Sequence, residues 1–149
     1  MGVIGDLAGQ SVYLDSNVFI YAVEGITPYV HPLRELLEAV ETGSVSAVTS
    51  ELALAEVLVQ PVVDEHVSLQ SQYKEMLQSG DGFQVVPISR PILVEAARLR
   101  GSLRALKLPD AIHIATARAS GCTVFLTNDR SLSSAPDLRV LLCSEMVGE

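Results

Sequence analysis

Four acidic residues of this sequence stand where carboxylates are costly unless something compensates them. Asp110 opens an almost wholly apolar helix-like run, and Asp129 follows an apolar strand-like run. Asp15 ends a short β-rich run, and Glu56 lies within the apolar segment ELALAEVLV. Charged residues are rarely buried without a partner. These acids are therefore the first candidates for a site that does chemistry.

Each acid also has a purely structural interpretation. Asp15 can cap the helix that follows it, and Asp110 can complement the dipole of the helix whose first turn it occupies. Asp129 can pair with Arg130 or form an Asx-turn. Glu56 is more informative, because one acid within an apolar helical run needs a partner. Together the four acids indicate a site more strongly than any one of them does.

Strand-like and helix-like segments alternate along the chain. We expect strands in five β-rich apolar runs, at 11–15, 44–50, 83–88, 122–127 and 138–143. Helical patterns occupy the intervals, at 16–24, 31–43, 51–60, 64–80, 90–106 and 109–119. This order predicts an α/β fold, a three-layer α/β/α sandwich around a mainly parallel five-stranded sheet.

The predicted sheet brings the acids together. The carboxyl ends of parallel strands share one edge with the N-termini of the following helices, and ligands bind there. Asp15, Asp110 and Asp129 can meet at this edge, and Glu56 can reach it from the helix after the second strand. Close carboxylates raise one another's pKa, and no lysine or histidine is spaced to pair with each of them. A hard divalent cation, Mg²⁺ or Mn²⁺, would resolve the conflict.

The composition favours a single domain over residues 1–149. The chain is 48% hydrophobic, with a mean hydropathy of +0.34, which is ample for a core. No apolar run is long enough to cross a membrane and the start shows no signal-peptide pattern, so we expect a cytoplasmic protein without a membrane partner. Cys122 and Cys143 lie in apolar runs and are expected to be buried free thiols.

Charge is distributed unevenly. Residues 1–89 carry twelve acids and two bases, whereas residues 90–149 carry six acids and eight bases. Because affinity for phosphate comes largely from Lys and Arg, a nucleic acid would have to contact the C-terminal part, or metal ions would have to offset the acids.

The C-terminal bases form one recognisable pattern. Arg100, Arg104 and Lys107 recur at i, i+4 and i+7, along the helix expected at 90–106 and the residue that follows it. They are either a solvated helix face or a phosphate track for RNA that leads towards Asp110. Arg130, beside the last acid, is the other candidate for substrate contact.

His113 lies three residues after Asp110, on the same helical face. We expect it to pack or to make a hydrogen bond, because an oxygen-rich site for a hard cation does not need imidazole.

The acids lie within four motifs that resemble one known family. In chain order, these motifs are YLDSNVFIY, SELALAEVLV, LPDAIHIATA and FLTNDR. At these spacings they resemble the PIN-domain nucleases, with the closest similarity to the VapC-type toxins of prokaryotic toxin–antitoxin pairs. The resemblance spans residues 12–130 and says little about the stretch 60–82.

The resemblance implies a sheet of order 3-2-1-4-5 and RNA cleavage that depends on Mg²⁺ or Mn²⁺. It makes Asp15, Glu56, Asp110 and Asp129 the catalytic acids, with Asp15, Asp110 and Asp129 as metal ligands. It also matches Ser16, Asn17 and Thr127 to polar positions that support the carboxylates, and Arg130, Arg104 and Lys107 are the candidate RNA contacts. The expected partners are RNA, an antitoxin protein and a second copy of the chain.

Other function classes fit less well. A haloacid-dehalogenase phosphatase needs a second Asp two residues after the first, where this chain has Asn17. A receiver domain needs an N-terminal acidic pair and a late Lys, and neither is present. A non-catalytic PIN-like module and an RNA-processing nuclease without an antitoxin remain alternatives; retention of all four acids argues against the first.

Overall fold

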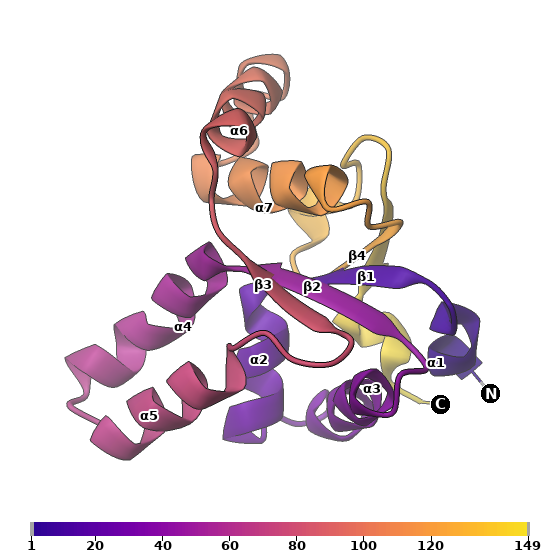
Figure 1. The fold of residues 1–149 in the computed structure, drawn as a ribbon, viewed down its shortest axis with the longest axis vertical. Coiled ribbons are helices and arrows are strands. Elements are labelled where there is room, and N and C mark those ends of the chain that lie inside the picture. Colours follow the sequence, from indigo (N-terminus) through magenta and orange to yellow (C-terminus); the bar gives the residue numbers. More distant parts are fainter. Residues whose placement is uncertain (1, 149) are drawn as a thin grey trace.

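A five-stranded sheet forms the centre of the molecule (Figure 1). The structure is a computed structural model, and it describes residues 2–148. The strands are β1 (Ser11–Leu14), β2 (Ser46–Ser50), β3 (Phe83–Val86), β4 (Val124–Thr127) and β5 (Arg139–Leu142). All neighbouring strands are parallel, in the order β3-β2-β1-β4-β5. The predicted sheet and its order are confirmed.

Helices cover both faces of the sheet (Figure 1). One face carries α6 (Arg90–Ser102) and α7 (Leu108–Ala119). The other carries α2 (Ser16–Glu24), α3 (Val30–Glu41), α4 (Glu51–Val63) and α5 (Val67–Met76). The short elements are α1 (Gly2–Leu7) and the 3₁₀ turns η1 (Arg130–Leu132) and η2 (Cys143–Met146). No helix within residues 2–148 is long and apolar enough to span a membrane.

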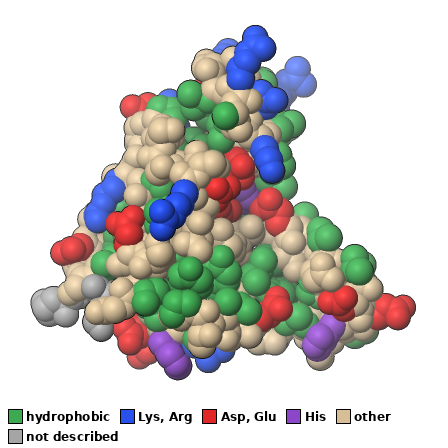
Figure 2. Space-filling view, turned by 180° about the vertical axis from the view of Figure 1, so that it is seen from behind, with side chains coloured by type: hydrophobic (Ala, Val, Ile, Leu, Met, Phe, Trp, Pro, Cys, Tyr) green, Lys and Arg blue, Asp and Glu red, His purple; other side chains and the backbone are tan. Residues whose placement is uncertain are grey.

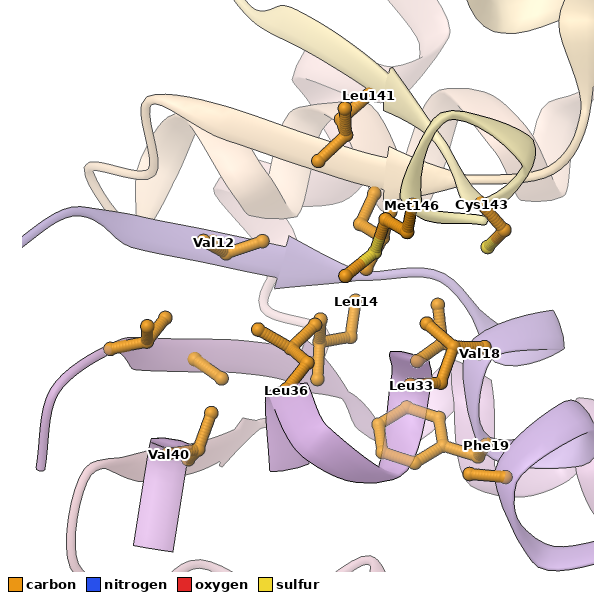
Figure 3. Packing of buried hydrophobic residues seen from close by; sticks show 14 of the residues in the cluster. Val12, Leu14, Val18, Phe19, Leu33, Leu36, Val40, Leu141, Cys143 and Met146 are labelled. Carbon is orange, nitrogen blue, oxygen red and sulfur yellow. The ribbon is translucent and has the colours of Figure 1, made fainter. Parts of the chain in front are cut away.

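Two hydrophobic cores lie on the two faces because side chains alternate along each strand. From β1, Val12 and Leu14 enter the core shared with α2 and α3, whose packing Figure 3 shows. Tyr13 points the other way, into the core under α6 and α7. Val12, Tyr13 and Leu14 are therefore all buried, and the alternation places the Tyr13 side chain on the face of the sheet that α7 covers.

The boundaries of two helices differ from the prediction in ways that matter for function. The helix expected to end before Pro61 continues to Val63, because a proline removes only its own N–H donor and the following turn keeps its hydrogen bond from the Asp64 backbone N–H to the Gln60 carbonyl oxygen. The helix expected at 90–106 ends at Ser102, where Leu103 leaves the helical conformation. Residues 103–107 form a turn instead, so the predicted basic stripe on a single helix face is wrong.

Two smaller differences concern polar and terminal segments. The helix expected at 64–80 is shorter, at Val67–Met76, because His66 caps it and Leu77 ends it. The short helix α1 at the N-terminus was not predicted. Neither change moves an acidic residue of the predicted site.

Candidate active site

Asp15 lies at the carboxyl end of the central strand. β1 and β4 pair in register at Leu14 and Leu126, so the residues that follow them, Asp15 and Thr127, lie level at the sheet edge. Thr127 Oγ1 donates to Asp15 Oδ2 at 2.6 Å, and the Ser16 backbone N–H donates to Oδ1 at 2.8 Å. Asp15 is buried and caps α2, as its structural interpretation predicts. This capping role is compatible with a place in the predicted acidic site.

Thr127 also fixes the start of the loop that carries Asp129. Its hydroxyl accepts the Asp129 backbone N–H at 3.1 Å. Asp129 Oδ1 in turn accepts from the Ser131 backbone N–H and hydroxyl, at 3.0 and 2.7 Å, and caps η1. Arg130 makes no ion pair with Asp129 in the part of the chain that the structure describes. One buried hydroxyl therefore connects two of the predicted acids.

Asp110 occupies the first turn of α7, as its sequence position predicts. Burial raises the pKa of its carboxyl group, and the negative charges of Asp15, Asp129 and Glu56 raise it further, while His113 opposes them. The other three predicted acids therefore all lie within electrostatic reach of Asp110. We call the four together the acidic cluster: Asp15, Glu56, Asp110 and Asp129. Among residues 2–148, no side chain bonds or pairs with the Asp110 carboxyl group.

Glu56 reaches the cluster from the middle of α4 and meets His113 of α7. The distance between Glu56 Oε1 and His113 Nε2 is 2.5 Å, and Nε2 lies 3.7 Å from Asp15 Oδ1. Burial alone would lower the pKa of His113, but its hydrogen bond to Glu56 and the charges of Asp15 and Glu56 outweigh burial, and the pKa is raised. No lysine or histidine is spaced in the sequence to pair with each of the four acids; one histidine, His113, nevertheless pairs with Glu56 and lies near Asp15, and the hydrogen bond expected of His113 is present.

Tyr13 and Ser50 complete the surroundings of His113, and sequence reasoning did not place either of them at the site. Tyr13 Oη lies 2.6 Å from His113 Nδ1 and donates to Ser50 Oγ at 3.0 Å. Ser50 stands at the N-cap of α4, but its side chain bonds Tyr13 and not the helix. The available signal was strand alternation, which turns Tyr13 towards the helix that carries Asp110 and His113.

The other polar candidates have different surroundings. Ser16 contributes its backbone N–H to Asp15, and no bond of its hydroxyl is found within residues 2–148. Asn17 Oδ1 is buried without a hydrogen-bond partner in that same range.

The candidate RNA contacts are exposed bases around the acidic cluster. Lys107 is the N-cap of α7, three residues before Asp110, and Arg104 lies in the preceding turn. Arg130 follows Asp129 directly and is also exposed. Figure 2 shows acidic side chains in a hollow between the α6–α7 end of the molecule and the α4–α5 end, with Lys and Arg side chains above them.

The donor set fits a hard divalent cation. Carboxylate oxygens of Asp15 and Glu56 lie within 4.8 Å of each other, and Asp110 contributes a carboxyl group whose pKa is raised by burial and by its acidic neighbours. Carboxylate oxygens are the ligands that Mg²⁺ and Mn²⁺ prefer. A cation bound here would remove the repulsion that the protein itself leaves around Asp110.

A protein-family model, described as the PIN domain, matches residues 12–138. The chain belongs to the PIN domain family. The match includes all four members of the acidic cluster and, apart from Ser11, the first four strands, so the family resemblance in the motifs is confirmed.

Solved structures share this PIN fold. VapBC2 from Rickettsia felis, bound to a promoter DNA fragment, has a TM-score of 0.70 at 16% identity, over 89% of this chain and 98% of that one. A toxin–antitoxin complex from Klebsiella pneumoniae has a TM-score of 0.63 at 26% identity, over 89% and 97%. Mycobacterium tuberculosis VapC20, described as a toxin that cleaves the sarcin–ricin loop, has a TM-score of 0.66 at 14% identity, over 86% and 98%. No curated protein matches the sequence of this PIN domain.

Proposed function

We propose that this PIN domain is a metal-dependent endoribonuclease that hydrolyses RNA phosphodiester bonds, and that it is the toxin of a toxin–antitoxin pair. The observation that carries the proposal is the acidic cluster, in which the Asp110 carboxyl group has three acidic neighbours and no bonded partner among residues 2–148. A structural role alone does not require four carboxylates to be held together at a cost.

Asp15 and Asp110 are the proposed direct ligands of Mg²⁺ or Mn²⁺, with Asp129 as a third. When bound, such a cation lowers the pKa of a water molecule and stabilises negative charge on a scissile phosphate. Thr127 orients Asp15 by donating to Oδ2 and holds the backbone of Asp129. Glu56, whose Oε1 lies 2.5 Å from His113 Nε2, has the proposed role of positioning the attacking water. Hydrolysis in this arrangement leaves a 5′-phosphate and a 3′-hydroxyl.

Arg104, Lys107 and Arg130 are the proposed contacts to the RNA backbone. Their support is position, because the first two precede Asp110 and the third follows Asp129, and all three are exposed. Phosphate contacts of this kind position a nucleic acid without reading its sequence.

An antitoxin and a second copy of the chain are the proposed protein partners, and the cytoplasm is the proposed location. Support for the antitoxin comes from the Klebsiella pneumoniae and Rickettsia felis structures, whose toxins share the fold. An Arg or Lys of the antitoxin, placed among the acids, would neutralise them in place of a cation. Support for self-association comes from exposed apolar side chains at the α4–α5 end: Val59, Val62, Val63 and Val67.

The nuclease proposal is tested by incubating the purified protein with RNA in Mg²⁺, in Mn²⁺ and in EDTA. We expect cleavage in either metal, none in EDTA, and none by Asp110→Asn. Asp6→Asn is the matched control, because Asp6 is exposed and its side chain makes no bond within residues 2–148. Cleavage that survives in EDTA or in Asp110→Asn would contradict the proposal.

The partner proposal is tested separately. A small reading frame beside this gene that encodes a DNA-binding protein should, when co-expressed, form a complex with the chain and inhibit cleavage. Lack of a complex with an active nuclease would favour an RNA-processing role.

A further inference from the structure

We propose that His113 is a positioning residue, which holds Glu56 at the acidic cluster by donating a hydrogen bond from Nε2. The inference rests on the proposed function, because it assigns a role within that site. Its basis is the chain of contacts that runs from Ser50 through Tyr13 and His113 to Glu56.

The direction of the hydrogen bond follows from the partners. An ionised carboxylate can only accept, so the 2.5 Å contact to Glu56 requires a proton on His113 Nε2. On the other side of the ring, Tyr13 has one hydroxyl proton and gives it to Ser50, so Tyr13 accepts from Nδ1–H. Both ring nitrogens are therefore engaged, and the ring has one orientation that satisfies them.

The ring is fixed by its burial. The His113 side chain is 1% exposed, and its ring packs edge-on against Tyr13, at a centroid distance of 5.6 Å and an interplanar angle of 63°. Tyr13 is itself stacked on Phe125 of β4, at 5.2 Å and 10°. The position of Nε2 is thus set by helix α7, which carries His113, and by packing against a residue of a central strand.

Glu56, by contrast, needs an external constraint. Its side chain is 32% exposed, and Oε2 has no hydrogen-bond partner in the described part of the chain. A long side chain at a half-exposed position samples several rotamers. His113 Nε2 holds one oxygen and leaves the other available, and at 3.7 Å from Asp15 Oδ1 it also lies between two carboxylates that repel each other.

Direct metal ligation by His113 is the competing assignment. A ligating Nε2 must give up its proton and its contact with Glu56, and 2.5 Å between Nε2 and Oε1 leaves no room for an ion between them. The geometry therefore favours positioning.

The first test uses the metal-free protein and needs no activity. In ¹⁵N-histidine-labelled protein, the Nε2–H of His113 should give a slowly exchanging NMR signal, identified by its loss in His113→Gln. We expect the signal to disappear in Glu56→Ala and to persist in Asp129→Asn, which removes another acid of the cluster that does not contact His113. Persistence in Glu56→Ala, or equal loss in both variants, would overturn the inference.

The second test measures cleavage. His113→Leu should lower kcat about 10- to 100-fold, the usual effect of losing a group that orients a site residue, with KM for RNA unchanged. His113→Gln, whose amide can donate to Glu56, should recover part of the rate, and His113→Leu combined with Glu56→Gln should be no slower than Glu56→Gln alone. Thr116→Val, which removes a buried hydroxyl one turn along α7, is the control for a polar loss in the same helix. Urea denaturation verifies that each variant is folded.

The outcomes separate the two proposals. No cleavage by the wild type in any metal would refute the proposed function, while the NMR result would still decide whether His113 holds Glu56. Two results would overturn the positioning role of His113. One is a wild-type cleavage rate in His113→Leu; the other is a double variant that cleaves more slowly than Glu56→Gln by the same factor that His113→Leu alone loses. Nitrogen coupling from His113 in the electron-paramagnetic spectrum of the Mn²⁺-loaded protein would assign direct ligation instead.

Discussion

Replacing Tyr13 by phenylalanine would remove one buried hydroxyl and leave the aromatic packing in place. The Tyr13 ring stacks on Phe125, and a phenylalanine ring can keep that contact. Only the oxygen is lost, together with its bonds to Ser50 at 3.0 Å and to His113 at 2.6 Å. Any change in stability therefore reports the hydroxyl network and not a large cavity.

The expected loss follows from the groups left behind. Ser50 Oγ and His113 Nδ1 would both be buried without their partner, and an unsatisfied buried polar group costs about 1–3 kcal/mol. Ser50 stands at the N-cap of α4 and can turn to the free backbone N–H groups of the helix, which offsets part of its cost. The free energy of unfolding should therefore fall by about 2–4 kcal/mol.

Urea denaturation, followed by circular dichroism in EDTA, measures this change. Tyr29→Phe is the matched control, because Tyr29 is stacked on Tyr21 but its hydroxyl makes no hydrogen bond within residues 2–148; it should change stability by less than about 0.5 kcal/mol. An unfolding midpoint of Tyr13→Phe equal to that of the wild type, with the same slope, would refute the reasoning and remove the physical basis for a fixed His113 ring.

Three further predictions concern the acidic cluster and one tight turn. Because burial and three acidic neighbours raise the pKa of Asp110, the folded protein binds this proton more tightly than the unfolded chain, so in EDTA the free energy of unfolding should fall as pH rises above about 4. Asp110→Asn should reduce that fall, leaving the part that comes from the raised pKa of His113, and should be more stable than the wild type at pH 7, as urea titrations across this range would show. Thr127→Val should lower the cleavage rate about 10- to 100-fold, measured on RNA, whereas Thr127→Ser should retain most of it. Gly82→Ala should destabilise the protein more than Gly121→Ala, as thermal unfolding would show. Both glycines have a positive φ, which costs a residue with a Cβ about 1–2 kcal/mol. Only at Gly82 would the added Cβ also lie 3.0 Å from a backbone oxygen, that of Val40.

The parallel sheet and the grouping of the acids could be predicted from the sequence, because both follow from local patterns and one general rule. Apolar β-rich runs fixed the five strands, and the rule that parallel strands end at one edge brought Asp15, Asp110 and Asp129 together. The rule on strand ends does not place Glu56, because this residue lies within the helix that follows the second strand and reaches the edge only if that helix approaches it. Glu56 was found because an acid within an apolar run is unusual.

The partner of Glu56 could not be predicted, because it depends on how two helices from different parts of the chain pack. The i+3 spacing placed His113 beside Asp110, but the distance to Glu56 depends on where α4 lies relative to α7. Likewise, the end of α6 at Ser102 depends on the turn that connects it to α7, and a helical period drawn through that turn produced a basic stripe that does not exist.

The order of the acids along the chain has a consequence for protein synthesis. Asp15 is joined to its neighbour Thr127 across 112 positions, and β1 cannot pair with β4 until the ribosome has made residues 124–127. A nascent or prematurely terminated chain that ends before Asp129 therefore holds scattered carboxylates and no assembled cluster. Because such distant segments must meet before the sheet closes, folding of this edge is slow compared with local helix formation. The acidic cluster of this protein can therefore assemble only after residues 124–129 have been translated.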